Sequence, residues 1–229
     1  MRAAHLVTVA HGTRTAAGNE VARALTAGAA ARLGWRATTS YVELCAPSFA
    51  EVVARAGSPV VAVPLLLSTG YHLRQDLPAA VAAADRDDVR LGRSLGPDRL
   101  LASAQTDRLR TAGARPGQPV VMVAAGSTDP AATTDLDAAA HLLAQAWDAP
   151  VRLATLSGHG PRLADVVRAG DAVSPYLLAT GHFHRKARHE ALAAGASVVA
   201  EVIGPHSLVV DLVVERALAL ALRAVGVPA

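Results

Sequence analysis

Short apolar runs alternate with longer amphipathic stretches along the first half of this chain. The apolar runs are rich in branched residues and predict buried strands at residues 5–10, 37–43, 59–67 and 89–92. The stretches that follow them predict helices at residues 16–33, 48–56, 76–84 and 98–111. Ser48 and Glu51 have the spacing of a capping box, which fits a helix that begins there. Continuously apolar strands that alternate with helices are typical of a parallel sheet covered on both faces.

The second half of the chain repeats the first. Four blocks recur in the same order, about 114, 114, 111 and 108 residues further on: Leu6–Thr13 as Val120–Ser127, Pro47–Val53 as Pro161–Val167, Pro64–Gly70 as Pro175–Gly181, and Gly96–Pro97 as Gly204–Pro205. The matching strands are predicted at residues 119–125, 151–156, 173–179 and 198–203. Asp129 and Pro130 have the pattern of an N-cap and a first helical residue. An apolar final helix is predicted from His206 to Arg223.

This repeat predicts the domain organisation. We expect an α/β fold with two similar domains, residues 1–113 and 118–229, each a parallel sheet flanked by helices. The segment from Ala112 to Pro119 is rich in glycine and proline and predicts a linker. A cleft is expected between the two domains.

Composition narrows the class of protein. The 229 residues are 52 % hydrophobic, yet no apolar run reaches the roughly 18 residues of a membrane helix. No signal-peptide pattern stands at the start, so we expect a cytoplasmic protein without a membrane partner. The single cysteine, Cys45, excludes an internal disulfide and a four-cysteine zinc site. Scattered arginines and a net charge of +3 argue against nucleic acid and suit a small, multiply anionic ligand.

Three polar residues of the first copy follow predicted strands. His11 comes after the first strand, Glu43 ends the second, and His72 comes after the third. A parallel sheet brings the carboxyl ends of its strands to one edge, where ligands bind. Two imidazoles and a carboxylate suit Fe²⁺, Co²⁺ or Ni²⁺, and the same groups can accept protons. Taken singly, each residue also fits an ordinary loop position or a solvated strand end.

The second copy offers an internal comparison. Ala125, Ser157 and Phe183 stand where His11, Glu43 and His72 stand in the first copy. A requirement of the fold would have kept both sets. The joint loss therefore indicates that the three residues form one functional unit.

Other residues near these positions have two interpretations each. Arg14 and Arg74 can bind substrate carboxylates or can simply be solvated. Cys45 can face the same site or be a small buried hydrophobe. His182 and His184 can form a second metal contact if the chain is extended there, or can be loop residues.

The chain resembles the class II chelatases of tetrapyrrole biosynthesis, the sirohydrochlorin ferrochelatases and cobaltochelatases. The resemblance rests on Val9–Arg14 (VAHGTR), Tyr41–Ser48 (YVELCAPS) and Val63–His72 (VPLLLSTGYH), and it covers nearly the whole chain. It implies that His11 and His72 bind the metal and remove protons, and that Glu43 assists. It also implies substrate binding by Arg14, Arg74, Ser68, Thr69 and Gly70.

The implied reaction joins sirohydrochlorin and a divalent metal and releases two protons, with no organic cofactor. Fe²⁺ and sirohaem biosynthesis are expected first, while Co²⁺ and cobalamin biosynthesis are the alternative, because imidazole accepts both metals. A non-catalytic carrier of metal or tetrapyrrole is a further alternative. A two-lobed periplasmic-type binding protein is another, against which the missing signal peptide argues. Some family members are half-length homodimers, so this chain is expected to be a monomer that fuses such a dimer.

Overall fold

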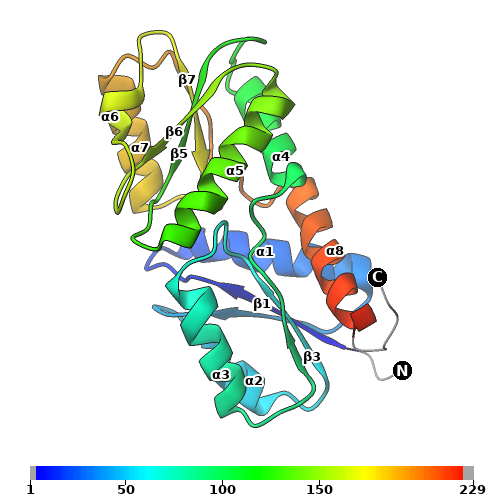
Figure 1. Cartoon of the computed structure of the whole chain (residues 1–229). Coiled ribbons are helices and arrows are strands. Elements are labelled where there is room, and N and C mark those ends of the chain that lie inside the picture. Colours follow the sequence, from blue (N-terminus) through cyan, green and yellow to red (C-terminus); the bar gives the residue numbers. More distant parts are fainter. Residues whose placement is uncertain (1–3, 224–229) are drawn as a thin grey trace. The chain divides into compact units, whose positions relative to one another are not determined.

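The computed structural model describes residues 4–223. It contains two four-stranded parallel sheets, with strand orders β2-β1-β3-β4 and β6-β5-β7-β8 (Figure 1). Helices flank each sheet. The predicted fold class, two similar α/β domains with parallel sheets, is therefore confirmed.

The first sheet is formed by residues of the first copy. Its strands are β1 (His5–Ala10), β2 (Ala37–Tyr41), β3 (Val60–Pro64) and β4 (Val89–Leu91). Its helices from the same copy are α1 (Ala16–Leu33), α2 (Phe49–Arg55) and α3 (Leu77–Ala83). All five residues of β3 are buried, as expected for a strand with helices on both sides. Figure 1 shows α2 and α3 together on one side of β1 and β3 and α1 on the other.

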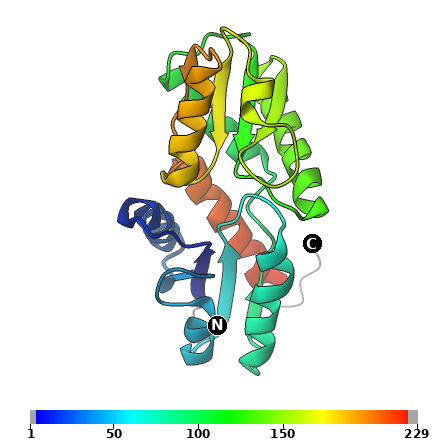
Figure 2. The ribbon, with the colours of Figure 1, turned by 90° about the vertical axis from the view of Figure 1, so that its left-hand side faces the viewer.

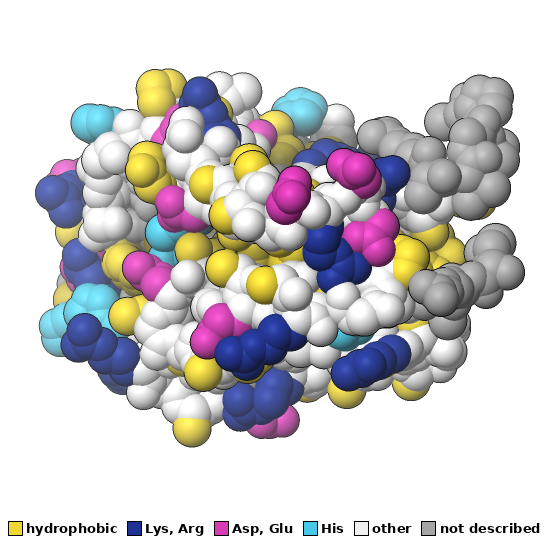
Figure 3. Space-filling model, turned by 90° about the horizontal axis from the view of Figure 1, so that it is seen from below, with side chains coloured by type: hydrophobic (Ala, Val, Ile, Leu, Met, Phe, Trp, Pro, Cys, Tyr) yellow, Lys and Arg dark blue, Asp and Glu magenta, His cyan; other side chains and the backbone are white. Residues whose placement is uncertain are grey.

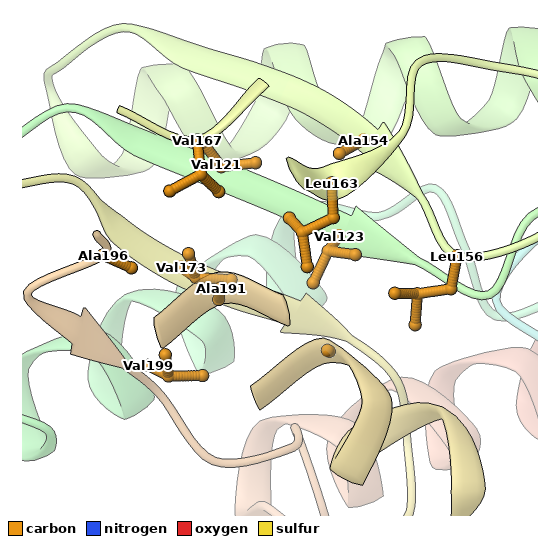
Figure 4. Close-up of a cluster of buried hydrophobic side chains, with 11 residues drawn as sticks. Val121, Val123, Ala154, Leu156, Leu163, Val167, Val173, Ala191, Ala196 and Val199 are labelled. Atoms are coloured by element: carbon orange, nitrogen blue, oxygen red, sulfur yellow. The ribbon is translucent and has the colours of Figure 1, made fainter. Parts of the chain in front are cut away.

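The second sheet repeats this arrangement. Its strands are β5 (Val120–Ala124), β6 (Val151–Thr155), β7 (Ala172–Tyr176) and β8 (Val198–Val199), and its helices include α5 (Pro130–Trp147), α6 (Leu163–Val166) and α7 (His182–Ala193). Side chains from β5, β6 and β7 meet those of α6 and α7 in a buried apolar cluster (Figure 4). The members of this cluster are Val121, Val123, Ala154, Leu156, Leu163, Val167, Val173, Ala187, Ala191, Ala196 and Val199.

The last helix of each copy belongs to the other copy's sheet. The described residues divide into one unit of 4–95 with 209–223 and a second unit of 96–208. Helix α4 (Arg99–Thr111) follows the first copy yet packs in the second unit, where Gln105 Nε2 donates to Ser174 Oγ at 2.8 Å. Helix α8 (Ser207–Arg223) follows the second copy yet packs in the first unit (Figures 1 and 2).

Contacts within the first unit show how α8 is held. Val210 lies against Gly28 of α1, where an added Cβ would stand 3.1 Å from the valine methyl. Arg32 of α1 forms an ion pair with Asp211, and Arg216 donates to the Leu95 carbonyl at 3.2 Å. The two spatial units thus differ from the two sequence repeats in the placement of α4 and α8. The physical reason is that α4 packs against β7 and α5 of the second copy, whereas α8 packs against α1 and the segment after β4 in the first copy.

Local sequence signals mark helix starts correctly. Ser48 accepts from the Glu51 N–H and Glu51 bonds the Ser48 N–H, which completes the capping box. Asp129 caps α5 by accepting from the Ala131 N–H, and Pro130 is the first helical residue.

Several strands end earlier than predicted. Strand β2 stops at Tyr41, so Glu43 lies in the turn beyond it. The chain turns there through Leu44, whose φ is +65°.

Helix α7 changes the interpretation of His182 and His184. Residues 182–184 form the first turn of this helix, not an extended strand. Side chains two positions apart on a helix point in different directions, so His182 and His184 do not converge as alternation would have required.

Within residues 4–223 no helix is long and apolar enough to cross a membrane. On the face in Figure 3, Lys and Arg side chains are interspersed with Asp and Glu side chains.

Candidate functional site

Three side chains of the first unit meet at the carboxyl edge of its sheet. His11 follows β1 directly, and Glu43 lies two residues beyond the end of β2. His72 opens a short π-helix, η1 (His72–Asp76), in the connection that follows β3. Since β1 lies between β2 and β3 in a parallel sheet, the three connections share one edge.

The geometry of this group suits a metal ion. One ligand atom from each of His11, Glu43 and His72 lies within 4.8 Å of the other two. His11 Nε2 is 3.5 Å from Glu43 Oε1, and the two imidazole rings meet edge to face with centroids 4.9 Å apart. The side chains are 50 %, 49 % and 29 % exposed for His11, Glu43 and His72. Three ligands on an open surface leave coordination positions free, unlike a closed structural site.

The backbone ties the first two ligands together. The Glu43 N–H donates to the His11 carbonyl at 3.1 Å, and the Cys45 N–H donates to the Glu43 carbonyl at 2.8 Å. Gly12 lies between these groups with φ at +96°, and an added Cβ would stand 2.0 Å from the Glu43 carbonyl oxygen. Only glycine fits this conformation and this space.

Side-chain hydrogen bonds also join the loop after β1 to the loop after β2. Asn19 of α1 accepts from the Thr13 N–H at 3.1 Å and donates to the Thr13 carbonyl at 2.8 Å. Its amide also donates to Cys45 Sγ at 3.0 Å, and the Cys45 thiol donates to the Thr13 carbonyl at 3.1 Å. Cys45 is thus part of the support beneath Glu43. The sequence carries no spacing signal for Asn19, and sequence reasoning missed it.

His72 is held by its own helical turn. The Leu77 N–H donates to the His72 carbonyl, the i to i−5 bond of a π-helix. His72 Nδ1 is 2.6 Å from Asp76 Oδ2. Sequence reasoning also missed Asp76, because the helix was predicted to begin at residue 76 and not at 72. The His-x-x-x-Asp spacing of residues 72–76 is the signal that could have found it.

The remaining predicted site residues lie around this group. Arg14 and Arg74 are exposed, three and two residues beyond His11 and His72. Ser68, Thr69 and Gly70 lie partly buried in the connection between β3 and η1. Nothing lies within 4 Å of a Cβ added at Gly70, so steric crowding does not explain that glycine.

Two large apolar side chains next to the ligands are exposed. Leu44 follows Glu43 and is 53 % exposed, and Tyr71 precedes His72 and is 67 % exposed. The Tyr71 and His72 rings meet edge to face with centroids 6.3 Å apart.

The second unit has no comparable group. His184 is buried, its Nε2 lies 3.7 Å from Glu201 Oε2, and this nitrogen has no hydrogen-bond partner among the described residues. Within residues 4–223, His11, Glu43 and His72 are the only set of three or more ligand side chains close enough to share an ion. The second metal contact considered for His182 and His184 has no third ligand in the described part of the chain.

Comparison with known proteins gives a curated relative and several solved structures. The chain is 28 % identical over 193 residues to a sirohydrochlorin ferrochelatase of Bacillus subtilis (strain 168), covering 76 % of this chain and 73 % of the relative. It is 24 % identical to SirB from Bacillus subtilis with Fe³⁺, with a TM-score of 0.83 and 98 % of each chain covered. It is 22 % identical to CbiX, the terminal enzyme for biosynthesis of sirohaem in denitrifying bacteria, with a TM-score of 0.69 over 95 % of this chain and 99 % of that one. At this identity the solved structures establish the fold.

The family model is matched twice along the chain. The CbiX model matches residues 5–112 and again residues 119–220, in agreement with the internal repeat. The resemblance to class II chelatases is thereby confirmed, and the chain belongs to the CbiX family.

Proposed function

We propose that this chain inserts a divalent metal into sirohydrochlorin, with Fe²⁺ the expected metal and sirohaem the expected end product. The observation that carries the proposal is the meeting of His11, Glu43 and His72 on an open sheet edge in a member of the CbiX family. The curated relative is a sirohydrochlorin ferrochelatase, which supports the same substrate here.

Each of the three side chains, His11, Glu43 and His72, has a role in this reaction. Two pyrrole N–H bonds of the ring must break as the metal forms bonds to the ring nitrogens, so two protons leave. The imidazoles of His11 and His72 hold the metal as it arrives and accept protons as it departs. Glu43, 3.5 Å from His11 Nε2, stabilises the imidazolium that forms when His11 takes a proton.

The surroundings suit a flat, anionic ring. Leu44 and Tyr71, next in sequence to Glu43 and His72, offer exposed apolar contacts. Arg14 and Arg74, both exposed, can pair with ring carboxylates without desolvation of a buried charge. We assign substrate contacts also to Ser68, Thr69 and Gly70. The second copy, which lacks the three ligands, adds no second centre, so one site per chain and a monomer are expected.

The three ligands are compatible with more than one divalent metal. Imidazole and carboxylate ligands accept Fe²⁺, Co²⁺ and Ni²⁺ alike. One solved relative of the same fold contains cobalt and another contains Fe³⁺. A cobaltochelatase of cobalamin biosynthesis is therefore the second candidate, and relative rates decide between the two.

The test is anaerobic incubation of the protein with sirohydrochlorin and each metal in turn, followed by the absorbance of the ring. We expect many turnovers per protein, fastest with Fe²⁺. His11→Ala and His72→Ala should each lower the rate at least about 100-fold while the fold persists, because loss of a partly exposed polar side chain at a sheet edge should move stability by no more than about 1 kcal/mol.

A matched control removes an imidazole elsewhere. His141 is exposed on α5 of the second unit, so His141→Ala should turn over at the normal rate. A single metallation per protein would instead identify a carrier. Normal rates for His11→Ala or His72→Ala would refute the assignment of the site.

A further inference from the structure

We propose that Asp76 is a positioning residue that fixes the ring and the tautomer of His72. The proposal rests on the proposed function, since it concerns how the same site holds its metal. Its basis is the 2.6 Å contact between His72 Nδ1 and Asp76 Oδ2, a short hydrogen bond between side chains four residues apart.

The contact determines which ring nitrogen is available. A carboxylate can only accept, so Nδ1 must carry the proton that it donates to Asp76. In the neutral ring, Nε2 then keeps its lone pair for a metal ion or for a pyrrole proton. A carboxylate behind a histidine ligand also increases the basicity of that ligand and holds its plane.

The backbone beneath this pair is built to bring the two side chains together. Pro78 has no N–H, so it cannot donate to the Arg74 carbonyl four residues earlier. The π-turn at His72–Asp76 lies immediately before Leu77 and Pro78, with the Leu77 N–H bonded to the His72 carbonyl. One extra residue in a turn rotates what precedes it by on the order of 100° relative to the helix that follows. His72 thus reaches the sheet edge although α3 presents a different face to the core.

The second copy supports the link between Asp76 and the metal group. The block offset of 111 places Ala187 at 76 + 111 and His189 at 78 + 111. Ala187 is fully buried in α7, which is an α-helix from His182 to Ala193. The copy that lost the counterpart of His72 therefore also lacks the carboxylate, the proline and the π-turn. A part that served only to start the helix would have been needed in both copies.

The exposure of Asp76 argues against a purely structural role. Its side chain is 42 % exposed, so an ion pair with His72 would add little stability by itself. Removing it should leave the fold almost unchanged and act on the ligand that it orients.

The experiment measures Co²⁺ binding to the full chain without tetrapyrrole, by titration calorimetry and by the visible spectrum of the bound ion. Asp76→Ala should weaken Co²⁺ binding about 10- to 100-fold, the usual range for the partner of a histidine ligand. Asp76→Asn keeps an acceptor oxygen at the same place and should recover most of the lost affinity. In turnover assays, Asp76→Ala should raise the KM for metal more than the KM for sirohydrochlorin.

The tautomer provides a readout that a structural role would not move. At mildly alkaline pH, nitrogen NMR should find His72 protonated at Nδ1 in the parent protein and shifted toward Nε2 protonation in Asp76→Ala. Asp107→Ala is the matched control, because Asp107 lies 3.5 Å from His206 Nε2 in the second unit. It should change neither Co²⁺ affinity nor the His72 signal.

Each outcome separates this proposal from the proposed function. Co²⁺ binding within threefold of the parent in Asp76→Ala, or equal losses in Asp76→Ala and Asp76→Asn, would overturn the positioning role. A parent protein that binds Co²⁺ but never metallates sirohydrochlorin would overturn the proposed function and leave the role of Asp76 testable. Should the alanine variant fail to fold, Asp76→Ser is expected to give the same loss, since its hydroxyl is too short to reach His72.

Discussion

Gly12 offers the sharpest test of how the backbone supports the metal group. Substitution by alanine adds one Cβ at a residue whose φ is +96°, where it would stand 2.0 Å from the Glu43 carbonyl oxygen. Left-handed strain in a residue other than glycine costs about 1–3 kcal/mol. Relief of the overlap requires a backbone shift that costs about 1–3 kcal/mol more. The total, about 2–6 kcal/mol, lies within the stability of an ordinary domain, so most of the protein should remain folded at low temperature.

Gly126 provides the matched control, because it has the same backbone and the same overlap in the second copy. Its φ is +91°, and an added Cβ would stand 1.8 Å from the Ser157 carbonyl oxygen. Gly126→Ala should therefore lose similar stability. The second copy has Ala125 and Ser157 where the first has His11 and Glu43, so no metal ligand would move.

The two variants should differ in Co²⁺ affinity and in the rate of metal insertion. Gly12→Ala must push the Glu43 carbonyl away and thereby displace Glu43 from His11 by about 1 Å, a misplacement that can cost about 100-fold in rate. We would measure unfolding in urea for both, then Co²⁺ affinity and the insertion rate at a temperature where both are folded. Gly126→Ala should keep the affinity and rate of the parent protein. Equal losses of Co²⁺ affinity in the two variants, or normal insertion by Gly12→Ala, would refute the reasoning.

Two other predictions concern stability. Burial, with a smaller contribution from the Arg36 charge, lowers the pKa of His5 from its ordinary value of 6.5, so the folded chain holds His5 neutral where the unfolded chain takes up a proton. Stability should therefore fall as the pH drops below 6.5, and His5→Gln should give a flatter dependence of the melting temperature on pH; an unchanged slope would contradict this. Leu212 of α8 is fully buried, so Leu212→Ala should lower the free energy of unfolding by about 2–5 kcal/mol in a urea titration. Leu222 of the same helix is 57 % exposed, so Leu222→Ala is its control and should change that free energy little.

The sheets could be predicted because their signal is local. Strands such as β3, β5 and β7 are buried along their whole length, and a continuous apolar run between turn residues reports this directly. The order β2-β1-β3-β4 then brings His11, Glu43 and His72 to one edge. The prediction that the three would converge needed only the direction of the strands, and the structure brings their ligand atoms within 4.8 Å of one another.

The exchange of α4 and α8 could not be predicted in the same way. Both helices follow a Gly-Pro turn, at Gly96 and at Gly204, and each has an apolar face that fits a parallel sheet. Because the two sheets descend from one repeat, either helix is locally compatible with either sheet. The choice depends on distant contacts, such as Val210 against Gly28 and Gln105 with Ser174. A pattern along the chain shows that a helix needs a sheet, but it does not show which one.

Asp76 illustrates a different limit. Its partner lies four residues away, yet spacing has meaning only within a known element, and the sequence predicts a helix only from residue 76 onward. A proline inside a helix usually argues against extending it backwards. Here the π-turn lets the helical segment start at His72, five residues before Leu77, and places His72 and Asp76 in contact.

The exchange of α4 and α8 between the two units explains why the chain needs its second copy, although that copy lacks the metal ligands. The first sheet carries the ligands, but the helix that packs against α1 and Leu95 on that side is α8, at the far end of the second copy. A chain that stopped after α4 would lack Val210 and Leu220, which lie against Gly28 and Gly92 of the first unit, and would leave an apolar face there uncovered. The second copy must therefore be made before the metal-binding unit is complete. Its sheet in turn packs against α4, so each half depends on the other for its last helix, and the loss of three ligands from one half leaves that dependence intact.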